Sequence, residues 1–296
     1  MADVTTYLAI GGAMELTPEN PLVDAFIKGS GGEDSVITIL PTASDYANEV
    51  GPLYESLFSK LSNDVEYYVI DRRDHTENPR LIDRIDRSTG IFFTGGNQLR
   101  ITSLLGGSPL MQAINRARSR GVFIAGTSAG ASAMSSTMIA GGKSDVMFKG
   151  SVDLSPGLGF ISNAVIDSHF IKRGRITRLL NVVSLNPGTI GLGLSENTGI
   201  LFKEGQSMIQ VMGSRQIIVV DGSSISHTNI ASLPDNKPFS VTDVRIHVLG
   251  NHYGFDIKTR ELFIPTKEMM ADSPDFDPQV GDLPFVPVKL LEGRDW

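Results

Sequence analysis

Short apolar runs alternate with helix-like segments through the first two thirds of the 296-residue chain. Each run is brief and is stopped by Gly or Pro, which is typical of buried parallel strands. The runs predict strands at Thr6–Ile10, Val36–Leu40, Val65–Ile70, Gly90–Phe93 and Gly121–Ala125. Between them, apolar residues recur at three- and four-residue spacing, which predicts amphipathic helices. Strands that alternate with helices indicate a parallel sheet covered by helices on both faces.

After Gly188 the pattern changes to closely spaced apolar runs with short turns, which predicts antiparallel strands added at one sheet edge. We therefore expect an α/β fold with a mostly parallel central sheet, formed as a single domain over residues 1–296. Several Pro and Asp residues predict an irregular tail over residues 273–296. The late strands are expected at Thr189–Leu194, Gly199–Phe202, Met208–Val211, Gln216–Val220, Val241–Leu249 and Glu261–Ile264.

Composition narrows the class of function. The net charge of −7 argues against a nucleic-acid partner. The chain has no Cys, which excludes disulfides, thiolate catalysis and Cys-ligated metals. No apolar run reaches the roughly 18 residues that span a bilayer, and the first residues do not form a signal peptide. We expect a cytoplasmic protein, unless a leader has been removed, with no membrane contact.

Neither a metal nor a cofactor is expected. The late His residues lack the spacing of metal ligands, and no carboxylate cluster forms a cage. The Gly11-Gly12-Ala13 segment lacks the further glycines of a nucleotide-binding fingerprint.

One segment carries the pattern of a nucleophilic serine. The sequence Gly126-Thr127-Ser128-Ala129-Gly130 follows an apolar strand and precedes an Ala-rich stretch. A nucleophile in such a sharp strand-to-helix turn leaves no room for side chains two positions away, so both positions are Gly. The free amides at the start of the helix can stabilise a developing oxyanion. The alternative is a Gly-Ser turn without chemistry.

A serine needs a base, and His169 is the best placed of the five His residues. It follows an apolar run, and strand ends are where a parallel sheet presents its active site. A third group should orient the imidazole. Glu196 follows the strand Thr189–Leu194 and is the candidate, although an acid in a turn often only faces water.

The oxyanion needs a second backbone donor beyond the amide of Ala129. The loop Thr94-Gly95-Gly96-Asn97-Gln98 ends the strand before the nucleophile, and its glycines permit close approach of the backbone. Asn97 and Gln98 either cap the next helix or contact substrate.

Four motifs together resemble the cyanophycinase family, serine peptidases related to aspartyl dipeptidase (peptidase E). They are Phe93-Thr94-Gly95-Gly96-Asn97-Gln98-Leu99-Arg100, Gly126-Thr127-Ser128-Ala129-Gly130-Ala131, Asp167-x-His169-Phe170-x-x-Arg173-x-Arg175-x-x-Arg178-Leu179 and Ser195-Glu196-Asn197-Thr198. The similarity runs from about Tyr7 to about Val220, with the motifs in the family's order.

The resemblance implies a flavodoxin-like, class I glutamine amidotransferase-like three-layer sandwich and a homodimer. It implies the triad Ser128, His169 and Glu196, and an oxyanion hole from the backbone of Gly96 or Asn97 and of Ala129. The implied reaction cuts cyanophycin, which is multi-L-arginyl-poly-L-aspartate, into β-aspartyl-arginine dipeptides. The implied substrate contacts are Gln98, Asp167, the adjoining Ser168, Arg173, Arg175 and Arg178.

The Arg residues suit a substrate rich in carboxylates, because a guanidinium holds a carboxylate by two parallel hydrogen bonds. Their spacing places Arg175 and Arg178 near one helix face, and a solvated basic helix is the alternative. The chain departs from the family at Ser168, where Gln is usual, and at Met14, where an acidic residue usually follows Ala13. Two other functions stay open: a dipeptidase acting on aspartyl or isoaspartyl peptides, and a catalytically silent binding protein.

Overall fold

The computed structural model describes residues 4–266 and 286–287 of the chain. All but two residues of the tail expected at 273–296 lie outside the described residues. The helices are α1 (Pro21–Gly29), α2 (Ala47–Phe58), α3 (Pro79–Arg87), α4 (Gln98–Leu105), α5 (Pro109–Ser119), α6 (Ala129–Ser132) and α7 (Ile176–Leu185), with 3-10 turns at Gly32–Asp34, Arg73–Glu77 and Ile230–Ser232.

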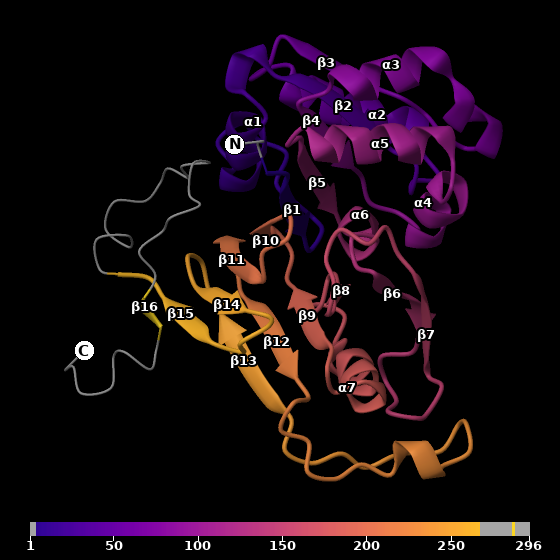
Figure 1. Ribbon diagram of the computed structural model, residues 1–296, viewed down its shortest axis with the longest axis vertical. Coiled ribbons are helices and arrows are strands. Elements are labelled where there is room, and N and C mark those ends of the chain that lie inside the picture. Colours follow the sequence, from indigo (N-terminus) through magenta and orange to yellow (C-terminus); the bar gives the residue numbers. More distant parts are fainter. Residues whose placement is uncertain (1–3, 267–285, 288–296) are drawn as a thin grey trace.

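A large sheet runs through the molecule in the order β16-β15-β14-β11-β10-β1-β5-β4-β2-β3 (Figure 1). The parallel strands are β1 (Thr6–Ile10), β2 (Val36–Leu40), β3 (Asp64–Tyr67), β4 (Gly90–Phe93) and β5 (Phe123–Thr127). Antiparallel strands continue the sheet beyond β1: β10 (Thr198–Lys203), β11 (Met208–Gly213), β14 (Gly254–Asp256), β15 (Leu262–Ile264) and β16 (Val286–Pro287).

Alternate residues of the parallel strands enter two apolar cores, one on each face of the large sheet. In β1, Leu8 and Ile10 join the core that contains buried residues of α1 and α2. Tyr7 and Ala9 join the core that contains buried residues of α3, α4 and α5. Both faces of β1, β2, β4 and β5 are therefore covered, which explains why their sequences are mostly apolar without alternation, whereas the edge strand β3 is partly exposed. The expected α/β class is confirmed.

A second, four-stranded sheet has the order β13-β12-β9-β8, and α7 packs against it (Figure 1). Its strands are β8 (Ala164–Asp167), β9 (Ile190–Leu194), β12 (Ile217–Asp221) and β13 (Arg245–Leu249). The expectation that all late strands join one edge was therefore wrong. They divide between two sheets, because an apolar run specifies burial but not the strand with which it pairs.

A separate hairpin of β6 (Thr137–Gly142) and β7 (Val152–Pro156) was not predicted. The bounds of β1, β2 and β4, by contrast, were predicted residue for residue. The ends of the parallel strands lie side by side, since Thr127 of β5 is level with Ile10 of β1, and Gly126 is level with Phe93 of β4. This edge of the sheet positions the candidate site.

Arg84 of α3 is 1% exposed and fastens that helix to the sheet. Its guanidinium donates to the carbonyls of Ile37 at 2.9 Å and Asp64 at 3.0 Å, and to the hydroxyl of Thr38 at 3.2 Å. It also forms an ion pair with the Asp64 carboxylate. A buried cation is tolerated only with such complete pairing.

We predict that Arg84→Ala lowers the free energy of unfolding by about 2–4 kcal/mol, because two backbone carbonyls lose their donor and a cavity forms. Urea unfolding measures the change. Arg87→Ala, at an exposed position of the same helix, is the control and should stay within about 0.5 kcal/mol of the parent. Equal effects of the two substitutions would contradict the prediction.

Candidate active site

Ser128 lies in a sharp turn between β5 and α6, with φ of 53° and ψ of −109°. Positive φ is strained for a residue with a side chain and is concentrated at functional sites. A Cβ on Gly130 would lie 2.5 Å from the carbonyl oxygen of Phe93, and one on Gly126 would lie 2.7 Å from the backbone of Gly130. The predicted reason for both glycines is thus confirmed.

Ser128, His169 and Glu196 form a chain of hydrogen bonds. The Ser128 Oγ lies 3.0 Å from His169 Nε2, and His169 Nδ1 lies 3.0 Å from Glu196 Oε1. An ionised carboxylate can only accept, so Nδ1 carries the ring proton and Nε2 presents its lone pair to the serine. The three groups therefore have the geometry in which a base can take a proton from a hydroxyl.

The electrostatics of the site favour the same protonation states. The hydrogen bond from His169, aided by the ammonium of Lys172, holds the pKa of Glu196 below its ordinary value. Burial lowers the pKa of His169, and the hydrogen bond with Glu196 opposes that shift. At neutral pH, Glu196 is thus charged and His169 is available as a base.

The end of β1 fastens the three segments that carry these side chains. Three successive carbonyls each accept one backbone amide, at 2.7 to 2.9 Å. The pairs are Ser128 to Ile10, His169 to Gly11, and Asn197, the neighbour of Glu196, to Gly12.

The glycine pair after β1 leaves room for this arrangement. A Cβ on Gly12 would lie 2.4 Å from His169 Nε2, and one on Gly11 would lie 2.0 Å from the carbonyl oxygen of Ser195. Gly12 also has φ of +101°, which residues with side chains rarely adopt. The imidazole therefore lies directly against bare backbone.

A pocket of about 250 Å³ opens beside Ser128. The candidate residues that line it are Gly96, Asn97, Gln98, Ser128, Ala129, Asp167, Ser168, Arg173, Arg175 and Arg178. Sequence analysis missed Ser132 and the β6 residues Ala140, Gly141 and Gly142, which also line it. The side-chain nitrogen Nε2 of Gln98 donates to the backbone carbonyl of Ile139 at 2.6 Å. The β6 strand, which was not predicted, therefore orients a side chain that was predicted to contact substrate.

Asp167 ends β8 and is 1% exposed between two guanidinium groups. Arg175 donates to one carboxylate oxygen at 2.9 Å, and Nε of Arg178 lies 3.1 Å from the other. Burial raises the pKa of Asp167, and both Arg residues oppose that shift. Arg175 also donates to the carbonyl of the buried Ser168 at 2.7 Å. Three mutually paired charged residues, Asp167, Arg175 and Arg178, are thus part of the pocket lining.

The sequence predicted that Arg175 and Arg178 lie on one helix, but only Arg178 lies within α7. Arg175 occupies the N-cap position of α7, which begins at Ile176, without a capping hydrogen bond from its side chain, and Gly174 in the turn before it has φ of +57°. Arg175 and Arg178 still converge, because both bind Asp167. They are not the solvated face that was the alternative, whereas Arg173 is exposed.

Asn97 is a helix cap. Its side-chain oxygen accepts from the amide of Leu99 at 2.9 Å, at the start of α4. Its own amide donates to the carbonyl of Ala43 at 2.8 Å. The amide of Asn97 is therefore already bound to protein in this structure.

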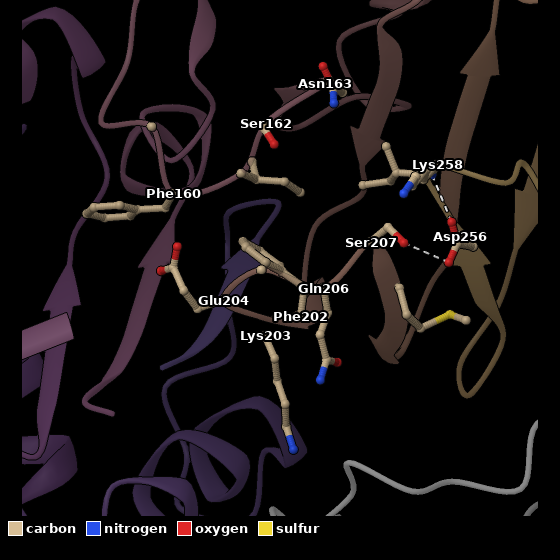
Figure 2. A pocket seen from close by; sticks show the side chains of 15 residues that line it. Phe160, Ser162, Asn163, Phe202, Lys203, Glu204, Gln206, Ser207, Asp256 and Lys258 are labelled. Carbon is tan, nitrogen blue, oxygen red and sulfur yellow. Dashed lines mark hydrogen bonds between the residues drawn. The ribbon is translucent and has the colours of Figure 1, made fainter. Parts of the chain in front are cut away.

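A larger pocket of about 650 Å³ lies away from these residues, between the β10–β11 turn, the loop at 159–163 and Asp256–Lys258 (Figure 2). Of the acids that line it, Asp256 accepts hydrogen bonds from the Ser207 hydroxyl and the Lys258 backbone amide, both at 2.8 Å, so this carboxylate stabilises a turn (Figure 2). Ser128 lines the smaller pocket, and His169 lies within hydrogen-bond distance of its hydroxyl, so we take the smaller pocket as the candidate site.

Two further observations concern the described residues only. They contain no group of three or more His, Asp or Glu side chains placed to hold a metal ion. Their helices are too short or too polar for any of them to cross a bilayer.

An α/β sheet with a serine, an imidazole and a carboxylate hydrogen-bonded in series at its strand ends defines a hydrolase class of site. The chain matches the model of Peptidase family S51 over residues 7–210 and belongs to that family.

Its relatives include enzymes named cyanophycinase. One from Synechococcus elongatus is 33% identical over 258 residues, covering 86% of this chain and 80% of that protein. Another from Geminocystis herdmanii is 34% identical over 260 residues, covering 87% and 95%. A crystal structure of a peptidase from an acI-B1 Actinobacterium shares the fold, with a TM-score of 0.66 at 20% identity, covering 86% of this chain and 98% of that one.

Proposed function

We propose that this peptidase hydrolyses cyanophycin to β-aspartyl-arginine dipeptides through Ser128, His169 and Glu196. The observation that carries the proposal is the pair of 3.0 Å contacts that join these three side chains. The support for the substrate is the cyanophycinase name of relatives that match most of the chain.

The proposed mechanism is acyl transfer in two halves. His169 Nε2 accepts the proton of Ser128 as its oxygen attacks the scissile carbonyl, and Glu196 stabilises the imidazolium. The imidazolium then protonates the leaving amine, and the C–N bond breaks to leave an acyl-enzyme. Water attacks the ester, His169 accepts its proton and returns it to Ser128, and the carboxylic acid product leaves.

The oxyanion would be held by backbone amides. Ala129 is the first residue of α6, so its amide has no carbonyl to bind within the helix. Gly96 is the better second donor of the two candidates, because the amide of Asn97 already donates to Ala43.

The charged residues that line the pocket support recognition of a carboxylate. Arg173 is exposed at the pocket, while Arg175 and Arg178 share the single charge of Asp167, so positive charge is in excess. An aspartyl residue of the substrate would offset that excess. Gln98 and Ser168 complete the proposed contacts.

Three broader statements belong to the proposal. Counted from β2, the order β3-β2-β4-β5 is the 2-1-3-4 order of a flavodoxin-like sheet, which supports the amidotransferase-like sandwich as one hydrolytic domain.

We also propose a cytoplasmic homodimer. Ile246 and Val248, which are 49% and 61% exposed on the end strand β13, are consistent with a contact between copies. Sedimentation velocity should give twice the chain mass of 31.9 kDa.

We predict that Ser128→Ala lowers cyanophycin hydrolysis by at least about a thousandfold, because no other group forms the acyl-enzyme. Mass spectrometry of the soluble products measures β-aspartyl-arginine. Ser119→Ala, at an exposed position of α5, is the control and should keep parental activity.

The same assay separates the alternatives. A dipeptidase would cleave β-aspartyl dipeptides and leave the polymer intact, and a silent binding protein would cleave neither. Normal hydrolysis by Ser128→Ala would overturn the mechanism.

We predict that kcat/KM falls on the acid side with a midpoint below pH 6.5, because burial lowers the pKa of His169 from that value. Protonated imidazole cannot accept the serine proton, so the rate is retained above this midpoint and lost below it. Initial rates of β-aspartyl-arginine release from a fixed, sub-saturating amount of cyanophycin, followed across pH by mass spectrometry, measure the curve. A midpoint clearly above pH 7 would contradict the assignment of His169 as a base with lowered pKa.

A further inference from the structure

Glu196 lies where the chain crosses from one sheet to the other. Strand β9 of the four-stranded sheet ends at Leu194, and strand β10 of the large sheet begins at Thr198. The ladder of neither sheet therefore fixes the turn at residues 195–197. Because a misplacement of about 1 Å can cost a hundredfold in rate, this turn needs a separate fastening.

Asn197 supplies contacts that could hold the turn. Its side chain is buried, with 7% of the residue exposed. The amide oxygen accepts from the backbone of Glu15 at 3.1 Å and from the Asn20 side chain at 2.8 Å. The amide nitrogen donates to the Ser214 hydroxyl at 3.2 Å. These contacts tie the turn to the loop after β1, to the cap of α1 and to the segment after β11.

The backbone of Asn197 adds to the same fastening. Its amide donates to Gly12 at 2.9 Å and its carbonyl accepts from Ser214 at 3.0 Å. Its φ of 48° lies in the left-handed region, which Asn tolerates better than most residues. The backbone amide and the backbone carbonyl of Asn197 are therefore both held by hydrogen bonds.

The charged neighbours of Glu196 are less able to direct it. Lys172 and Arg215 lie 3.4 and 4.0 Å from its carboxylate, and their side chains are 68% and 58% exposed. Exposed ion pairs of this kind contribute little and permit many geometries. The buried amide of Asn197 is the more specific constraint.

We propose that Asn197 is a positioning residue, whose buried side chain fixes the turn so that the Glu196 carboxylate reaches Nδ1 of His169. This role rests on the proposed function of Ser128, His169 and Glu196. The hydrogen bonds of Asn197 go to neither Ser128 nor a residue that lines the pocket, and Asn197 is not itself a lining residue.

Two substitutions at this position test the role. Asn197→Gly keeps the left-handed backbone and removes every side-chain contact. It should lower kcat by about a hundredfold with KM changed less than about twofold. It should also move the acid limb, which is the fall of kcat/KM on the acid side of the pH profile, to lower pH. The reason is that His169 loses the hydrogen bond that favours its charged form.

Asn197→Asp is the conservative partner. Its carboxylate can accept from Glu15 and Asn20, and the Ser214 hydroxyl can donate to it. It should retain most of kcat and move the acid limb to higher pH, because the added negative charge favours protonated His169. A role in stability alone would lower the melting temperature without moving the limb. Unchanged kcat and limb in Asn197→Gly would overturn the proposal.

A control and a second variant keep the test decisive. Asn236→Gly changes an exposed left-handed Asn that lies outside the site, with φ of 62°, and should leave the rate unchanged. If Asn197→Gly does not fold, Asn20→Ser removes one donor to Asn197 and keeps a helix cap. It should shift the limb in the same direction by a smaller amount, and an unmoved limb would overturn the proposal.

The rate of Ser128 labelling by a fluorophosphonate, followed by intact mass, separates this proposal from the choice of substrate. Labelling of the parent without cleavage of cyanophycin would overturn the substrate assignment, and slower labelling of Asn197→Gly would still support the positioning role. A parent that is neither labelled nor active would overturn both.

Discussion

Three successive carbonyls at the end of β1 hold the whole site together. Ile10, Gly11 and Gly12 each accept an amide from a different segment, and those segments carry Ser128, His169 and Glu196. Because these hydrogen bonds join backbone to backbone, they fix the main chain of the three segments independently of the side-chain rotamers. Side-chain contacts, such as those of Asn197, then refine the direction of each group. The site depends on β1 lying between β5 and β10 in the sheet.

Sequence reasoning reached this site because strand ends are marked locally. A buried parallel strand is an apolar run with no alternation, and a glycine at its end permits a turn that other residues resist. The bounds of β1, β2 and β4 and the turn around Ser128 followed from those rules. His169 and Glu196 were singled out because each follows an apolar run, and the structure brings His169 against Ser128 and Glu196 against His169.

The features that were missed depend on contacts between distant residues. Nothing near Ile217 in the sequence says that β12 pairs with β9 rather than extending the large sheet. The hairpin of β6 and β7 is partly exposed and has no long apolar run, although it lines the pocket and orients Gln98. Arg175 could be read as helical until the structure showed that its pairing with Asp167 sets its place.

The order of synthesis gives the arrangement at β1 a consequence for the newborn enzyme. The first strand leaves the ribosome early, but its antiparallel neighbour β10 and the acid-bearing turn emerge far later. An unfinished copy that ends before the turn has a serine and an imidazole without the carboxylate that orients them. Under the proposed mechanism, full hydrolytic activity therefore requires that the chain be translated past Glu196, and a shorter product lacks a part of the site without any separate inhibitor.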